Sequence, residues 1–182
     1  MNHYFFLLFV PLFSLGQKSP VKTSFRNGSI ALGSWSVINM TVAAAAVKNA
    51  DGQALHFHQM NGYWNVVNGS IAAYSLISPV FSQRKSLPEA ELAKKYKKIF
   101  LINAGLDVVY ITSGGFLNYF SGTKNPERNQ GFGTSFMLQG GFLLAYDLWM
   151  ANRMNRWMDS KDQGRLQLRP APYGIHLSYR LD

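Results

Sequence analysis

The chain contains no cysteine, and it is also poor in acidic residues. Without cysteine, disulfide bonds, thiol catalysis, thiolate metal sites and a lipid-modified N-terminal cysteine are excluded. Nine acidic residues stand against eighteen Lys and Arg among 182 residues, which gives a net charge of +9. A basic balance is typical of proteins that bind nucleic acid or anionic lipid, and of membrane proteins with basic cytoplasmic loops. The positions of the charges therefore have to separate these classes.

Charged residues are missing from four long stretches, apart from one carboxylate in each of the last two. The stretches are residues 27–47, residues 52–83, residues 99–123 with Asp107, and residues 129–152 with Asp147. Each is long enough for a helix of about 20 residues to cross a bilayer core, where charged side chains are costly. The sequence predicts an all-α fold, a four-helix transmembrane bundle with a short N-terminal hydrophobic segment and an extended C-terminal tail.

The predicted membrane domain covers residues 28–152. Its spans lie at about residues 28–47, 62–81, 99–120 and 131–152. Short connections such as the turn-rich loop 121–130 make sequential helices antiparallel neighbours, as in a four-helix bundle. The mean hydropathy of −0.06 is low for four spans. A water-soluble helical bundle is the alternative that this composition leaves open.

The two ends of the chain differ from the predicted domain. Residues 1–16 contain an apolar run with the length of a signal-peptide core, but no Lys or Arg precedes it. A cleaved signal peptide is the preferred interpretation, and a short membrane anchor is the alternative. Residues 153–182 form a predicted basic C-terminal tail. Alternation of apolar and polar residues at 175–181 is typical of a short strand, although an extended surface tail is preferred.

Basic residues divide unevenly between the two sides of the predicted membrane, with fifteen on one side and three on the other. By the positive-inside rule, the basic side is expected to face the cytoplasm. The expected location is a bacterial inner membrane, which the chain crosses several times. A cleaved signal peptide would reverse this orientation, so the orientation stays open. The expected partners are the lipid bilayer and either another protein or a second copy of the chain. Nucleic acid binding is not expected, because no zinc-finger or RNA-binding signature is present. Lysines preceding the third span, at residues 94–98, make either a solvated charge run or an anionic-lipid contact.

Asp107 is the strongest candidate for a functional residue, because a carboxylate within a span is expected to face the bundle interior or to be protonated. Asn103, Asp107 and Tyr110 fall on one face of the third predicted helix. The matching polar residues of the other helices are Ser29, Ser36 and Asn39 of the first, Asn61, Asn65, Asn68 and Ser75 of the second, and Ser135, Gln139 and Asp147 of the fourth. We expect the four faces to converge on a polar core.

Two interpretations of this core are open. In the first, amides and hydroxyls only join the helices through interhelical hydrogen bonds. In the second, the core binds a small polar ligand, a cation or a proton, in a binding or assembly subunit that is not an enzyme. The candidate ligand-binding residues are Asp107, Asn103, Tyr110, Asn65, Asn68, Gln139 and Asp147. The alternative function is a membrane-embedded enzyme or small transporter using Asp107 and Asp147 as a carboxylate pair, which requires the two groups to meet or to line one cavity.

Other chemistry finds little support in the sequence. His56 and His58 form a His-x-His pair that is a weak metal candidate, since no third ligand is near in sequence. No serine-hydrolase, phosphate-binding or zinc-protease motif is present. We expect no catalytic residue and no cofactor.

Four blocks of the chain resemble an uncharacterised bacterial family of small multi-spanning helical proteins, a domain of unknown function. The blocks are residues 32–36 with Asn39, residues 57–61 with Trp64, Asn65 and Asn68, residues 103–107 with Tyr110 and Gly114, and residues 131–133 with 139–144 and Asp147. The resemblance covers about residues 28–150. It implies a four-helix membrane domain behind a signal-like segment and brings no known activity.

Overall fold

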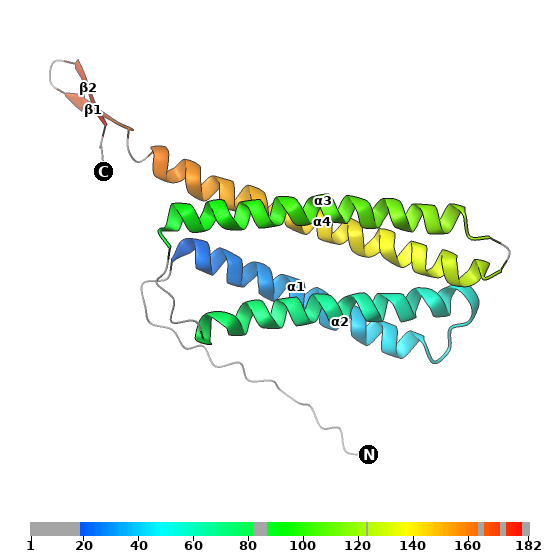
Figure 1. The fold of residues 1–182 in the computed structure, drawn as a ribbon. Helices are drawn as coiled ribbons and strands as arrows, with labels where there is room; N and C mark the ends of the chain where they lie inside the picture. Colours follow the sequence, from blue (N-terminus) through cyan, green and yellow to red (C-terminus); the bar gives the residue numbers. More distant parts are fainter. Residues whose placement is uncertain (1–18, 82–86, 123, 164–165, 172–173, 180–182) are drawn as a thin grey trace.

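Four long helices followed by two short strands make up the protein, as a computed structural model shows (Figure 1). The structure describes residues 19–81, 87–122, 124–163, 166–171 and 174–179. The elements are α1 (Pro20–Ala46), α2 (Gly52–Phe81), α3 (Glu89–Tyr119), α4 (Pro126–Gln163), β1 (Leu166–Ala171) and β2 (Gly174–Tyr179). The four predicted helices are confirmed, in the predicted order. The predicted signal peptide or anchor at residues 1–16 lies outside the described residues.

Local sequence explains where the helices begin and turn. The Ser19 hydroxyl accepts a hydrogen bond from the Lys22 backbone N–H at 3.2 Å, and Pro20 occupies the first turn of α1. Gly52 and Gly122 have φ angles of +50° and +69°. These left-handed conformations suit glycine, and they allow the short connections between α1 and α2 and between α3 and α4.

The bundle consists of two antiparallel hairpins, α1 with α2 and α3 with α4, joined mainly through α2 and α4 (Figure 1). The prediction that all sequential helices are neighbours is wrong for α2 and α3, whose described backbones do not come close. Gly131 explains why α4, and not α3, packs beside α2. A Cβ atom there would lie 2.5 Å from the Gln53 carbonyl oxygen, so only glycine permits this approach of α4 to α2.

Two of the predicted boundaries need correction. The third helix begins earlier than the predicted span, because α3 runs without interruption from Glu89 and includes the lysines of residues 94–98. The predicted tail begins too early, since α4 continues to Gln163. Charges ended the predicted span at residue 152, but a helix can continue beyond the apolar segment when its next turns pack. Met154 of this extension is fully buried.

The extended tail was also predicted without a partner. In the structure β1 and β2 form an antiparallel pair, with Leu166 opposite Tyr179 and Ala171 opposite Gly174. The alternation at residues 175–181 indicated the second strand correctly. It could not indicate the first, because an alternating pattern shows one strand's faces and not its hydrogen-bonding partner.

Residues seven apart form the contact between α3 and α4. On α3 these buried positions include Ala93, Phe100, Asp107 and Gly114, and on α4 they are Gly133, Gly140, Asp147 and Met154. A seven-residue repeat keeps one face of a helix against its partner, as in a coiled coil. We call this contact the heptad seam. Its glycines bring the backbones very close, since a Cβ atom on Gly133 would lie 2.5 Å from the Gly114 carbonyl oxygen.

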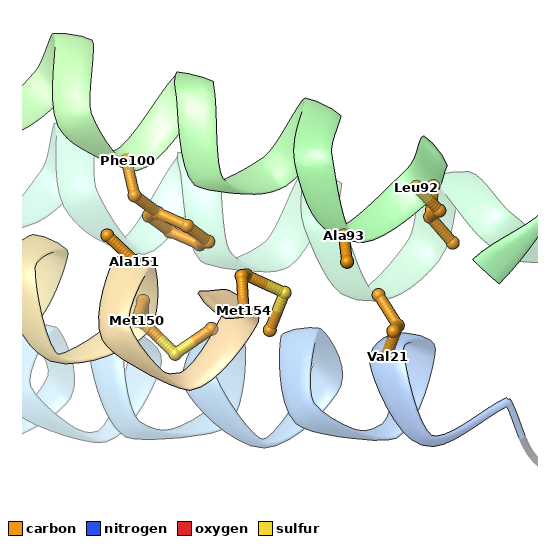
Figure 2. Close-up of a cluster of buried hydrophobic side chains, with 7 residues drawn as sticks. All are labelled: Val21, Leu92, Ala93, Phe100, Met150, Ala151 and Met154. Carbon is orange, nitrogen blue, oxygen red and sulfur yellow. The ribbon is translucent and has the colours of Figure 1, made fainter. Parts of the chain in front are cut away.

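An apolar core lies at the end of the bundle where α1 and α3 begin and α4 ends (Figure 2). Figure 2 shows Phe100 of α3 above Met150 and Met154 of α4, with Val21 of α1 below. The remaining members of the cluster are Leu92, Ala93 and Ala151. This core holds α1 to the α3–α4 hairpin at the basic end of the molecule.

Large apolar side chains cover the outside of all four helices. Examples are Val37 and Ile38 of α1, Val66 and Ile71 of α2, Val109 and Phe116 of α3, and Leu138 and Leu148 of α4, which are 43–63% exposed. By length and composition, α1 and α3 are apolar enough to cross a membrane. Only 22% of the apolar window in each of these two helices is buried. Their apolar residues therefore face the surroundings more than the protein interior.

The heptad seam leads to a first prediction. Gly133→Ala places a methyl group against the Gly114 carbonyl, so it should destabilise the bundle by about 1–3 kcal/mol through overpacking. The matched control is Gly141→Ala on the same helix, where an added Cβ meets nothing within 4 Å. Thermal unfolding in detergent, followed by circular dichroism, measures both variants. Equal midpoints for the two variants would contradict the close contact at the seam.

Candidate functional site

The interior of the bundle is unusually polar. Among the residues that the structure describes, ten buried side chains are polar or charged, namely Ser24, Ser29, Ser36, Asn61, Asn65, Asn68, Asp107, Ser135, Gln139 and Asp147. All four helices contribute to this set. Nine of the ten lie on the polar faces identified in the sequence, and Ser24 is the exception. Buried polar groups are costly unless they find partners, so their contacts decide what this interior can do.

A closed ring of hydrogen bonds joins α1, α2 and α4. The Trp35 indole N–H donates to Gln139 Oε1 at 3.0 Å, and the Gln139 amide donates to Asn61 Oδ1. The Asn61 amide donates to Asn39 Oδ1 at 3.1 Å, and the Asn39 amide returns to the Trp35 carbonyl at 2.9 Å. Asn65 Nδ2 joins the ring at the Asn61 carbonyl, at 2.7 Å. These contacts are those of a structural network that fixes helix positions.

Asp107 and Asp147 meet across the heptad seam. Both side chains are buried, with exposed fractions of 3% and 5%, and their carboxyl groups lie within hydrogen-bonding reach of each other. Gly140 makes this contact possible, because a Cβ atom there would lie 3.1 Å from the Asp107 carbonyl oxygen and 2.9 Å from the Ile111 side chain. A hydrogen bond between two carboxyl groups requires a proton on one of them. We call these two residues the carboxyl pair.

Several buried polar atoms have no hydrogen-bond partner among the described residues. They are His58 Nδ1, Trp64 Nε1, Asn65 Oδ1, Asn68 Nδ2, Asp107 Oδ2 and Ser135 Oγ. For Asp107 Oδ2 this means that no amide or hydroxyl of the described chain donates a hydrogen bond to it. Buried atoms of this kind mark places where a proton, water or ion completes the structure.

The predicted site residues do not all come together. Asn103 is exposed, and Ala104 is buried in its place. The prediction assigned Asn103 to the inner face because it precedes Asp107 by four residues. The seam instead repeats every seven residues, and position 103 falls outside it. Asn65 and Asn68 are buried on α2, and Gln139 belongs to the hydrogen-bond ring.

Tyr110 is half-buried in an aromatic group rather than at the carboxyl pair. Its ring lies 4.8 Å from that of Trp64, which in turn lies 5.4 Å from that of Phe136. The interplanar angles of 70° and 84° are edge-to-face, an arrangement that aromatic rings favour. This group links α3 to α2, whose backbones do not approach each other.

The two histidines of the predicted weak metal candidate, His56 and His58, lie at the opposite end from the apolar core. His56 Nδ1 lies 3.1 Å from Gln59 Oε1, and the His56 ring packs edge-on against Phe132. His58 is half-buried against Phe57. Within the described parts of the chain, no group of three or more His, Cys, Asp or Glu side chains is placed to hold a metal ion.

Two structural contacts were missed at the sequence level. Trp35 closes the hydrogen-bond ring and stacks on Phe142, with ring centroids 3.9 Å apart. Ser24 accepts hydrogen bonds from Arg153 Nε at 3.0 Å and from Trp157 Nε1 at 3.1 Å. The sequence indicates neither contact, because a tryptophan within a span is expected to pack as an apolar residue. A serine in the first turns of a helix is expected to be solvated. A signal for Ser24 exists only once α4 is known to extend past residue 152.

Comparison with known proteins places the chain in a family. Residues 31–148 match the family of unknown function DUF6992, and the chain belongs to that family. The match covers the hydrogen-bond ring and both members of the carboxyl pair. It agrees with the resemblance to a domain of unknown function found in the sequence. No curated protein and no solved structure matches the chain.

The hydrogen-bond ring gives a second prediction. Gln139→Leu removes the acceptor of the Trp35 indole and the donor to Asn61, so it should lower stability by about 1–3 kcal/mol. Thr112→Val is the control, because Thr112 is exposed and bonds only to its own helix. Unfolding in detergent measures both changes, and Trp emission reports the loss of the indole contact. A Gln139→Leu variant as stable as the control would show that the ring contributes nothing.

Proposed function

We propose that this protein is a multi-pass membrane protein whose four helices cross a bilayer and whose interior holds an exchangeable proton at Asp107 and Asp147. One observation carries the proposal, namely that two buried carboxyl groups lie within hydrogen-bonding reach of each other inside a bundle with an apolar outer surface. Intramembrane carboxylates are expensive and mark proton or ion sites in membrane proteins. The polar core is then a binding site as well as a structural network.

The distribution of side chains supports the membrane position. A bundle in water buries its large apolar residues and exposes its amides, whereas here Asn61, Asn65 and Gln139 are buried and Val37, Ile71 and Val109 are exposed. Contiguous apolar surfaces of this kind mark contact with lipid or with protein. The average hydropathy of α2 and α4 underestimates how apolar their outer surfaces are. Their inward-facing Asn, Gln and Gly residues lower the average, although these residues do not face lipid.

Charges at the two ends of the bundle suggest an orientation. α1 and α3 begin, and α4 leaves the apolar region, at the same end (Figure 1). That end carries Lys22, Arg26, Arg156 and the lysines of residues 94–98, whereas the opposite end carries Lys48, Lys124 and Arg128. By the positive-inside rule, the first end faces the cytoplasm, with the protein in a bacterial inner membrane. A partner protein or a second copy of the chain stays a prediction.

The chemistry of the carboxyl pair follows from its surroundings. Two negative charges in contact repel strongly where no water screens them, so at least one proton is retained when the helices are packed. Releasing that proton requires a separation of the two groups or a cation in its place. The alternative function, a small transporter or enzyme using the pair, rests on the same contact. A proton or small ion suits the site better than a substrate, since Gly140 has no space even for a methyl group.

The carboxyl pair gives a third prediction. Infrared spectra of the protein at neutral pH should contain the band of a protonated carboxyl group, because the pair shares a proton. Asp107→Asn and Asp147→Asn should each remove that band, since the new amide donates to the remaining carboxylate without an acid proton. Asp51→Asn is the control, because Asp51 is exposed.

Three infrared outcomes distinguish the possibilities. Loss of the band in both variants but not in the control supports the proposal. If adding sodium removes the protonated carboxyl band from the wild-type spectrum, and does the same in the Asp51→Asn control, a cation replaces the proton at the carboxyl pair. A wild-type spectrum without any protonated carboxyl band would refute the shared proton.

The absence of cysteine makes a fourth prediction simple to test. Lys95→Cys and Lys124→Cys place single thiols at opposite ends of the bundle, and Val109→Cys places one on the apolar surface. In intact cells or sealed vesicles, an impermeant maleimide should label position 124 from outside and position 95 only after permeabilisation. Position 109 should stay unlabelled in the bilayer. Labelling of positions 95 and 124 from the same side would contradict a four-span arrangement.

A further inference from the structure

A groove lies beside residues 94–102 of α3, where that helix passes the last turns of α4. It has a volume of about 620 Å³ and is lined by Lys94, Lys97, Lys98, Leu101, Ile102 and Met158. Three amines therefore border a wall that is otherwise apolar. If the chain spans a membrane as proposed, the groove lies where the third span meets the aqueous boundary.

The apolar wall continues along the same face of α3. Lys94 and Lys98 stand one turn apart, and Leu101 and Ile102 follow one turn further on, on the side that these lysines share. Leu101 and Ile102 are 46% and 55% exposed. The next turn presents Gly105, where a Cβ atom would meet nothing within 4 Å. We call the strip from Leu101 through Gly105 the apolar track.

Two of the three amines are free to meet a ligand. Lys97 Nζ donates to Asn155 Oδ1 at 2.7 Å, so its position is fixed by α4. Lys94 and Lys98 are exposed. Simple solvation would account for the two lysines, but not for the groove between them and α4 or for the open track below. Basic groups directly above an exposed apolar strip match the shape of an amphiphile with an anionic head group.

We propose that this groove binds an anionic glycerophospholipid, with its phosphate at the Lys94 and Lys98 amines and an acyl chain along the apolar track. The lipid would lie across the α3–α4 contact at the basic end of the bundle. This proposal rests on the proposed membrane position of the chain, but not on the proton at the carboxyl pair.

Native mass spectrometry of the full chain in detergent tests the lipid site. Phosphatidylglycerol and phosphatidylcholine with identical acyl chains serve as probes, and the wild type should bind the first more tightly. The Lys94→Gln/Lys98→Gln double variant should weaken phosphatidylglycerol binding by about fivefold for each lysine removed. The matched control is Lys48→Gln/Lys124→Gln, which removes two lysines at the opposite end and should leave the preference intact.

A second pair of variants tests the apolar track. Gly105→Leu adds a side chain to the track at a position where the Cβ atom meets nothing within 4 Å, and it should weaken binding of both lipids. Gly141→Leu, at another glycine where an added Cβ is unopposed, should not. Soluble glycerol phosphate should compete poorly, because it has no acyl chain. Full competition by glycerol phosphate would reduce the site to a phosphate contact and overturn the proposal. Equal binding of the two lipids, or equal losses in the test and control variants, would overturn it as well.

Extraction separates failure of this proposal from failure of the membrane position. Sodium carbonate should leave the wild type and all four variants in the membrane fraction. Retention in the membrane without a preference for phosphatidylglycerol would overturn the lipid site alone. Release of the wild type by carbonate would overturn the membrane position and the lipid site together.

Discussion

Close backbone contact between α3 and α4 determines where the buried polar groups of this bundle can lie. Gly114 and Gly133 face each other at one point of the heptad seam. One repeat further along the seam, Gly140 packs against the backbone of Asp107. With larger residues at these positions the helices would stand further apart, and the side chains of Asp107 and Asp147 would not reach each other. The carboxyl pair is therefore a consequence of glycine spacing as much as of the two acidic residues themselves.

The buried polar groups differ in how their hydrogen-bonding needs are met. The ring through Trp35, Asn39, Asn61 and Gln139 pairs each donor with an acceptor, as a network that fixes helix positions should. The carboxyl pair cannot be satisfied in this way, because carboxylates only accept hydrogen bonds unless one is protonated. The paired amides support the first interpretation of the polar core, in which polar side chains join the helices. Binding of a proton at the carboxyl pair stays a proposal.

Sequence reasoning succeeded where a single helix carries the information. Charge-free stretches located the helices, and the polar faces contained Asn61, Gln139 and Asp147, all of which are buried. It failed where two helices must be known together. Asn103 shares a face with Asp107 on an isolated helix of 3.6 residues per turn, but the contact with α4 follows a repeat of seven and leaves it exposed. The extension of α4 past residue 152 is stable because of burial against α1 and α3, which no local pattern in α4 reveals.

The sequence by itself determined the number and order of the helices and their polar faces, because the cost of burying charge and the period of a helix act within one segment. Only the tertiary structure decided which helices are neighbours and that Asp107 meets Asp147. It also decided that Lys97 is held by Asn155. These facts depend on the distance and rotation between helices, which glycine contacts such as that of Gly131 with α2 set and which no single segment encodes.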